Sequence, residues 1–184
     1  MSGTGGGAGR LLKEFANPIG SSGECAMVLY LVRHGEAIDK GEGPARPLTV
    51  QGRRDVEAVA GLAKRAGIEV QQIRHSGKRR AEETAEILGE FLQPAGGVVA
   101  VSGLAPNDDV HAVAELLKRE SQPLMVVGHL PFLERLLSLL VTGEPDHSVV
   151  RFQKGGIVCL EWDAITRAWV VQWAVAPALA LAGQ

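Results

Sequence analysis

The sequence has little of what marks a secreted, metal-bound or membrane-spanning protein. It holds two cysteines in 184 residues, Cys25 and Cys159, and their separation fits neither a metal-ligand nor a redox motif. A disulfide framework is therefore disfavoured, and a reducing, cytoplasmic compartment is expected. No apolar run approaches the roughly 20 residues that a membrane-spanning helix needs. The first residues also lack the basic-then-apolar pattern of a signal peptide.

The chain lacks an excess of either charge as well. Nineteen Lys and Arg stand against 21 Asp and Glu, for a formal net charge of −2. Proteins dedicated to nucleic acid usually carry a basic excess, and disordered acidic chains carry the opposite one, so neither class is favoured. With 46% hydrophobic residues, the length fits one domain with a sizeable core.

Glycine is unevenly distributed. Seven of the 23 glycines lie in residues 1–26, before the first patterned apolar segment. We therefore predict that residues 1–26 are a flexible leader, a cloning remnant or the product of a misassigned upstream start. Residues 27–184 are then expected to form a single domain.

From residue 27 onward, short aliphatic runs alternate with segments of helical periodicity. Strands are predicted at 27–32, 70–75, 98–101, 123–127, 157–162 and 168–175. Helices are predicted from the Thr49 cap to about Gly67, at 80–92, from Asp108 or Asp109 to 117, and from Pro131 in a first turn to about 141. This alternation predicts an α/β three-layer sandwich: a mostly parallel central sheet with helices on both faces and an antiparallel C-terminal edge hairpin.

Unusual polar residues follow three of the predicted strands. Arg33 and His34 follow the first, residues 76–80 the second, and His129 the fourth. Because ligands of such folds gather at the carboxyl ends of the strands, we expect these side chains to converge. Guanidinium groups donate in pairs to phosphate oxygens, and imidazole serves as nucleophile or proton donor. The sequence therefore predicts a phosphate site.

Four ordered segments resemble the motifs of one family. Residues 29–36 contain Arg-His-Gly, residues 46–52 contain Arg-Pro-Leu-Thr followed by Gly52, residues 75–85 follow a Ser-x-x-x-Arg-Ala-x-x-Thr-Ala pattern, and residues 126–131 contain Gly-His-Leu-Pro. Together they resemble the histidine phosphatase superfamily, also called phosphoglycerate-mutase-like. The short length, Arg46 and Gly-His-Leu-Pro resemble its SixA group of phosphohistidine phosphatases in particular.

The resemblance implies a role for each matched residue. His34 is the expected nucleophile, which becomes a transient phosphohistidine that water hydrolyses. Arg33, Arg80 and His129 are expected to hold the phosphoryl oxygens, with Arg46 reaching in from its loop. We expect a backbone carbonyl in the Arg-His-Gly turn to fix the tautomer of His34, and neighbouring positive charge to keep its ring neutral. No metal or cofactor is implied.

The sequence departs from the family pattern at three points. Gly77 and Glu83 replace the usual proline and glutamine, and Pro106 stands where many relatives carry a glutamate general acid. Three carboxyl groups remain open as substitutes for that acid: Asp108, Asp109 and Glu36. A missing acid fits a P–N bond, whose imidazole leaves more readily than an alkoxide.

Only 48 residues separate Arg80 from His129, which leaves no room for the cap insertion of larger relatives. The site should then be open enough to admit a protein. The leading prediction is therefore a metal-independent phosphatase for phosphohistidine in a signalling protein, with no nucleic-acid or membrane partner. A phosphatase for a small phosphoester metabolite and a non-catalytic phosphate-binding module remain alternatives. Taken singly, His129 also fits a near-core imidazole, Arg46 a solvated loop charge, and Asp108 and Asp109 helix caps.

Overall fold

A computed structural model describes residues 27–39, 41 and 45–182. The predicted leader, residues 1–26, lies outside the described residues, as does Cys25. No helix in the described part of the chain is long and apolar enough to span a membrane.

A mixed six-stranded sheet forms the middle layer, in the order β3-β2-β4-β1-β5-β6. Its strands are β1 (Val28–Arg33), β2 (Gln72–His75), β3 (Val98–Ala100), β4 (Leu124–Gly128), β5 (Ile157–Asp163) and β6 (Ala168–Val175). The described helices are α2 (Val50–Ala66), α3 (Arg79–Leu92), α4 (Val110–Leu117), α5 (Phe132–Thr142) and α6 (Pro177–Ala182). The expected α/β three-layer architecture is confirmed.

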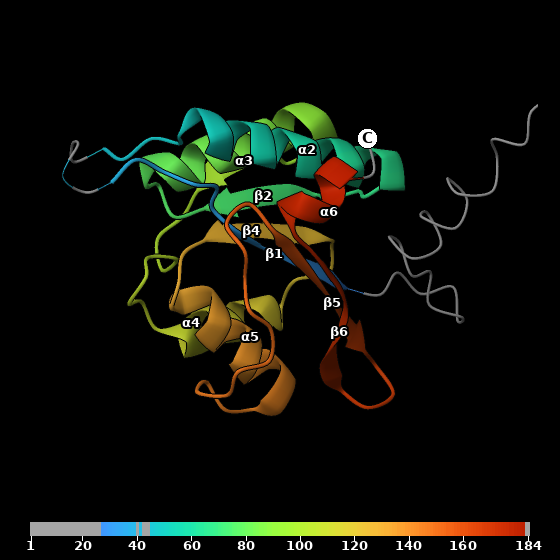
Figure 1. Ribbon diagram of the computed structural model, residues 1–184. Helices are drawn as coiled ribbons and strands as arrows, with labels where there is room; N and C mark the ends of the chain where they lie inside the picture. Colours follow the sequence, from blue (N-terminus) through green and yellow to red (C-terminus); the bar gives the residue numbers. More distant parts are fainter. Residues whose placement is uncertain (1–26, 40, 42–44, 183–184) are drawn as a thin grey trace, which may run out of the picture.

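Helices cover both faces of the sheet, as Figure 1 shows: α2, α3 and α6 lie on one side, and α4 and α5 on the other. Each face has its own apolar core, because side chains of a strand alternate between the two faces. Tyr30 and Val32 of β1 belong to the cluster under α2 and α3, whereas Leu29 and Leu31 belong to the cluster under α4 and α5. Burial on both faces explains why β1 and β4 are continuously apolar.

The strand register brings three chain segments to one edge. β1 and β2 both run parallel to β4, with Arg33 opposite Gly128 and His75 opposite Val127. The residues that follow these strands therefore start from the same end of the sheet. β5 runs antiparallel to β1, with Ile157 opposite Val32, so the turn before β5 reaches the same edge.

Most predicted elements are present with bounds shifted by one or two residues. The hydroxyl of Thr49 accepts a hydrogen bond from the Gly52 amide and begins α2, and Gly67 ends it in a left-handed conformation (φ 74°). Asp109, and not Asp108, caps α4. One placement was wrong: Pro131 is the N-cap of α5 and lies outside its first turn. The short helix α6 was not predicted.

Candidate active site

The two imidazoles meet at the carboxyl edge of the sheet. The rings of His34 and His129 lie with their centroids 4.9 Å apart. Nε of Arg80, in the first turn of α3, donates to His34 Nε2 at 3.2 Å. Ser76, just after β2, lies with its hydroxyl oxygen 2.6 Å from His129 Nε2. The segments expected to converge therefore do so.

The Arg-His-Gly turn is fixed by hydrogen bonds from three directions. The His34 amide donates to the Gly128 carbonyl at 3.1 Å, and the Gly155 amide donates to the Arg33 carbonyl at 2.9 Å. The Gly35 amide donates to the hydroxyl of buried Thr84 at 3.0 Å. Gly35 has no room for a side chain, since a Cβ there would lie 2.8 Å from Val56 of α2. The turn is thus anchored to β4, to α3 and to the segment before β5.

His34 has the tautomer that a nucleophile needs. Its Nδ1 lies 2.7 Å from the Gly35 carbonyl oxygen, which is only an acceptor, so we assign the ring proton to Nδ1. Nε2 then carries the lone pair and accepts from Arg80. Burial, together with the charges of Arg80, Arg33 and Arg46, lowers the pKa of His34 to about 4, against the raising effect of the Gly35 carbonyl. The ring is therefore neutral at pH 7, and burial contributes more to this than the neighbouring charge that sequence reasoning emphasised.

His129 is also neutral. Burial, followed by electrostatic interactions with His34 and Arg80, lowers its pKa to about 3. Its Nδ1 is buried and has no hydrogen-bond partner among the described residues. Nε2 lies toward Ser76, and a neutral imidazole carries its single N–H on one of the two ring nitrogens.

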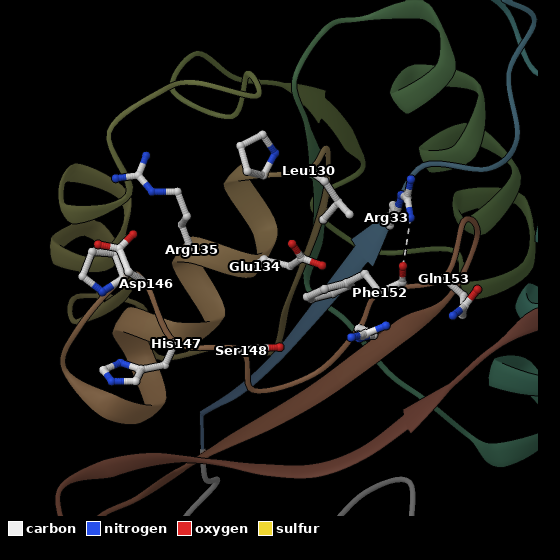
Figure 2. A pocket seen from close by; sticks show the side chains of 12 residues that line it. Arg33, Leu130, Glu134, Arg135, Asp146, His147, Ser148, Phe152 and Gln153 are labelled. Atoms are coloured by element: carbon white, nitrogen blue, oxygen red, sulfur yellow. Dashed lines mark hydrogen bonds between the residues drawn. The ribbon is translucent and has the colours of Figure 1, made fainter.

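Arg33 lies at the boundary between this site and a groove. One terminal nitrogen of its guanidinium donates to the Phe152 carbonyl at 2.9 Å, while its Nε is buried without a partner among the described residues. Burial lowers the pKa of Arg33, and the charge of Glu134 acts in the opposite direction. Figure 2 shows the guanidinium at one end of the groove.

Arg46 approaches from the loop before α2. Its backbone has a left-handed φ of 48°, which is uncommon outside glycine and costs energy. Nε donates to the Ile38 carbonyl at 3.0 Å. The charge of Arg46 lowers the pKa of His34, His129 and Arg80, so the structure places this residue within electrostatic reach of the site.

The adjacent residues Arg79 and Arg80 differ in the groups that they contact. Arg79 pairs with Glu82 at 3.1 Å and with Glu83 at 2.9 Å, whereas Arg80 faces His34. Of the two arginines, Arg80 is therefore the one that the structure brings to His34. Glu83, the departure from the family's glutamine, is buried and accepts from the Leu48 amide at 2.7 Å.

The three open acid candidates are engaged elsewhere. Asp108 accepts from the Ala105 amide at 2.7 Å, and Asp109 accepts from the His111 amide at 2.9 Å. Glu36 lies 3.2 Å from Lys154 Nζ, and this hydrogen bond and charge lower its pKa. No hydrogen bond or ion pair within the described residues joins any of these carboxylates to either imidazole. No group of three or more His, Cys, Asp or Glu side chains within the described residues is arranged to hold a metal ion.

Sequence reasoning missed the supports of the site. No role was predicted for Thr84, whose hydroxyl links two motifs by accepting from the Gly35 amide and also donates to the Arg80 carbonyl at 2.7 Å within α3. Ser76 was expected near the site without a defined partner. Gly155 carried no motif, although its left-handed φ of 75° is a conformation that glycine adopts readily.

Three comparisons with known proteins agree with this geometry. The family model of the histidine phosphatase superfamily (branch 1) matches residues 29–104. An uncharacterised protein of Picosynechococcus sp. is 35% identical over 142 residues, which cover 73% of this chain and 84% of the relative. Phosphohistidine phosphatase SixA of Escherichia coli K12 is 29% identical over 123 residues, which cover 64% of this chain and 76% of SixA. A structure of the protein histidine phosphatase SixA with tungstate matches with a TM-score of 0.73 and 25% identity, over 83% of this chain and 99% of that one.

The fold and the two-histidine site define a phosphatase built on an α/β sandwich. The chain belongs to the histidine phosphatase superfamily, and its overall structure is similar to that of SixA. The resemblance inferred from the four ordered motifs is therefore confirmed.

Proposed function

We propose that the protein removes the phosphoryl group from phosphohistidine in a signalling protein, through a covalent phosphohistidine on His34 and without a metal ion. The observation that carries this proposal is the state of His34. Its Nε2 lone pair lies at the meeting point of the site, while Nδ1 donates to the Gly35 carbonyl. A neutral imidazole held in this way is ready to attack phosphorus.

In the first step Nε2 of His34 attacks phosphorus, and the bond from phosphorus to the leaving group breaks with its electron pair. His34 becomes a phosphorylated imidazolium, and its Nδ1–H remains on the Gly35 carbonyl. Arg33, Arg80 and His129 are the proposed donors to the phosphoryl oxygens, with Arg46 adding positive charge. Fixed donors of this kind stabilise charge on a transferring phosphoryl group.

In the second step water attacks the same phosphorus. The bond between phosphorus and Nε2 breaks and its electron pair returns to the ring, while both protons of the water stay on the product, which is released as dihydrogen phosphate. His34 departs as a neutral imidazole because Nδ1 has kept its proton throughout. This step therefore needs no separate acid for the leaving nitrogen.

The choice of a P–N substrate is supported by the carboxylates. Asp108, Asp109 and Glu36 are held by the contacts described above, and none touches His34 or His129. An alkoxide leaving group needs a proton donor, whereas an imidazole that carries a proton on its other nitrogen does not. The similarity to a phosphohistidine phosphatase and to a structure with tungstate, a tetrahedral oxyanion, supports the same choice.

A protein substrate is supported by the openness of the site. Between Arg80 and His129 the chain forms the rest of α3, then β3, α4 and β4, with no added helix or strand to cover the site. The groove beside Arg33 is lined by the charged residues Arg135 and Arg151, whose side chains make no ion pair or hydrogen bond with any described residue. Unpaired charges beside the site suit the polar surface of a partner protein.

We also propose the cytoplasm as the location of this reaction. The thiol of Cys159 is free and buried, and burial raises its pKa to about 12. A protonated, unpaired thiol of this kind is typical of proteins from reducing compartments.

The test compares one preparation on a phosphohistidine protein and on a panel of sugar phosphates, nucleotides and other phosphoesters. We expect kcat/KM to be highest for the phosphohistidine protein. His34→Ala should abolish turnover, whereas His111→Ala, which removes an exposed imidazole on α4, should retain it. Preferential turnover of a small phosphoester by the wild type would replace this proposal with the metabolite alternative. Binding of phosphate compounds without any turnover would favour a binding module.

A further inference from the structure

A groove of about 630 Å³ adjoins the side chain of Arg33, at the edge of the site. Two of its lining residues are chain neighbours of the histidines: Arg33 precedes His34, and Leu130 follows His129. The rest of the lining comes from the first turns of α5 and from the segment before β5 (Figure 2). An in-line displacement needs room for the leaving group beside the phosphoryl site, and this groove provides it.

Glu134 supplies a carboxylate to the groove close to Arg33. It lies in the first turn of α5 and is half-buried. Its side chain makes no hydrogen bond or ion pair with any described residue, although its charge is felt by Arg33. In Figure 2 the carboxylate points into the groove, between the helix and the side chain of Phe152. The mechanism above gives this acceptor no role.

From this geometry we infer that Glu134 accepts a hydrogen bond from the leaving imidazole of a phosphohistidine substrate. The inference rests on the proposed function and deepens it. In the substrate ring, one nitrogen is bonded to phosphorus and the other bears a proton. When His34 attacks, the P–N bond breaks and its electron pair stays on the first nitrogen. The ring then leaves as neutral imidazole, with its proton still on the nitrogen that faces Glu134.

The carboxylate acts by favouring the protonated form of the substrate ring. A nearby negative charge raises the pKa of an imidazole, so more of the bound substrate carries the proton that its departure requires. Without that proton the ring would have to leave as imidazolate, a far stronger base. Glu134 would thus play for the substrate the part that the Gly35 carbonyl plays for His34. Each accepts a hydrogen bond from the N–H of an imidazole that must leave phosphorus.

A carboxylate in the first turn of a helix also has a purely structural use, because it interacts favourably with the helix dipole. That use affects the stability of α5 and treats all substrates alike. The two roles are therefore separated by comparing substrates. One substrate should release a protonated imidazole, and the other should release a group that needs no proton.

The experiment uses the full-length chain and the variant Glu134→Gln, with Glu90→Gln on the exposed surface of α3 as the matched control. The substrates are a phosphohistidine protein and p-nitrophenyl phosphate, whose nitrophenolate leaves without a proton. We expect Glu134→Gln to lower the ratio of kcat/KM for the phosphohistidine protein to that for p-nitrophenyl phosphate by about tenfold, the size of a lost charge-assisted hydrogen bond. Glu90→Gln should leave this ratio as in the wild type.

The pH profile gives a second readout. On the phosphohistidine protein, the alkaline fall in rate should begin at about one pH unit lower in Glu134→Gln than in the wild type, because the neutral amide no longer favours the protonated ring. The other titratable and charged groups that line the groove are the same in both proteins: Arg33, Arg135, Asp146, His147 and Arg151. The shift therefore reports the substituted side chain.

Two results would overturn the inference. An unchanged ratio of the two substrates, whether both rates fall together or neither falls, would leave Glu134 with a structural role only. An unshifted alkaline limb would do the same. If the wild type itself does not turn over the phosphohistidine protein, the proposed function fails first, and the inference fails with it. The wild-type control thus distinguishes the two failures.

Discussion

Replacing Thr84 by valine tests how the Arg-His-Gly turn is held. Thr84 is completely buried, and its hydroxyl both accepts from the Gly35 amide at 3.0 Å and donates to the Arg80 carbonyl at 2.7 Å. Valine has nearly the same shape but no hydroxyl. Thr84→Val therefore leaves the buried Gly35 N–H without its acceptor and removes a restraint on Gly35, the residue whose carbonyl orients His34.

The size of the effect follows from these two contacts. A buried N–H without a partner costs about 1–3 kcal/mol of unfolding free energy. The Arg80 carbonyl loses less, because it can still accept the helical hydrogen bond from four residues along the chain. Thr84→Ser is the matched control, since it keeps the hydroxyl and removes one methyl group, worth about 1 kcal/mol. The two variants thus lose comparable stability for different reasons.

The turnover number kcat distinguishes Thr84→Val from Thr84→Ser. We expect Thr84→Val to lower kcat on p-nitrophenyl phosphate by about tenfold. A less well positioned His34 should raise the activation free energy by about 1.4 kcal/mol, which corresponds to that factor. Thr84→Ser should stay within about twofold of the wild type by the same relation. Urea unfolding gives the stability of each variant, and kcat is measured where both are fully folded. Equal kcat values for the two variants would refute the view that this hydroxyl positions the nucleophile.

Four further predictions concern the pH dependence of activity, the pH dependence of stability, metal ions and the N-terminal segment. Because the pKa of His34 is lowered to about 4, turnover of p-nitrophenyl phosphate should persist at about pH 5 and fall below about pH 4. A fall in rate near pH 6.5, the ordinary pKa of histidine, would contradict this. The same shift should lower the unfolding free energy as the pH drops from about 6.5 to about 4, since the unfolded chain binds the proton more readily; urea titrations across this range check the sign. EDTA should leave the rate unchanged, and a strict requirement for a divalent ion would exclude the mechanism. Deletion of residues 1–26 should preserve melting temperature and rate, and a large loss of either would make this segment part of the domain.

The features that sequence reasoning predicted are those with local signals. The apolar runs before Arg33 and His129 identified two strands, and a more polar segment with Val70 and Ile73 identified a third before Ser76. The parallel pairing of the three strands brings their ends together. Helix α2 was bounded by Thr49 and Gly67, whose capping roles depend only on neighbouring residues. Fold class and the meeting of the site segments were therefore predictable.

The features that sequence reasoning missed depend on contacts between residues far apart in the sequence. The hydrogen bond from the Leu48 amide to Glu83 spans 35 residues, and no local pattern indicates it. The charge of the neighbouring arginines was correctly predicted to lower the pKa of His34, but burial, the larger cause, was missed because it follows from packing. Glu134 has no motif at all, and its place beside Arg33 emerges only when α5 and the segment before β5 form one groove.

The central claim is that the reaction passes through a phosphohistidine on His34, and rapid-quench labelling tests it most directly. The enzyme is mixed with a phosphohistidine protein carrying ³²P, quenched in alkali and mapped by mass spectrometry. We predict an alkali-stable, acid-labile label on His34 that is absent in His34→Ala and present in His111→Ala. A label that persists in His34→Ala, or that maps to another residue, would contradict the account.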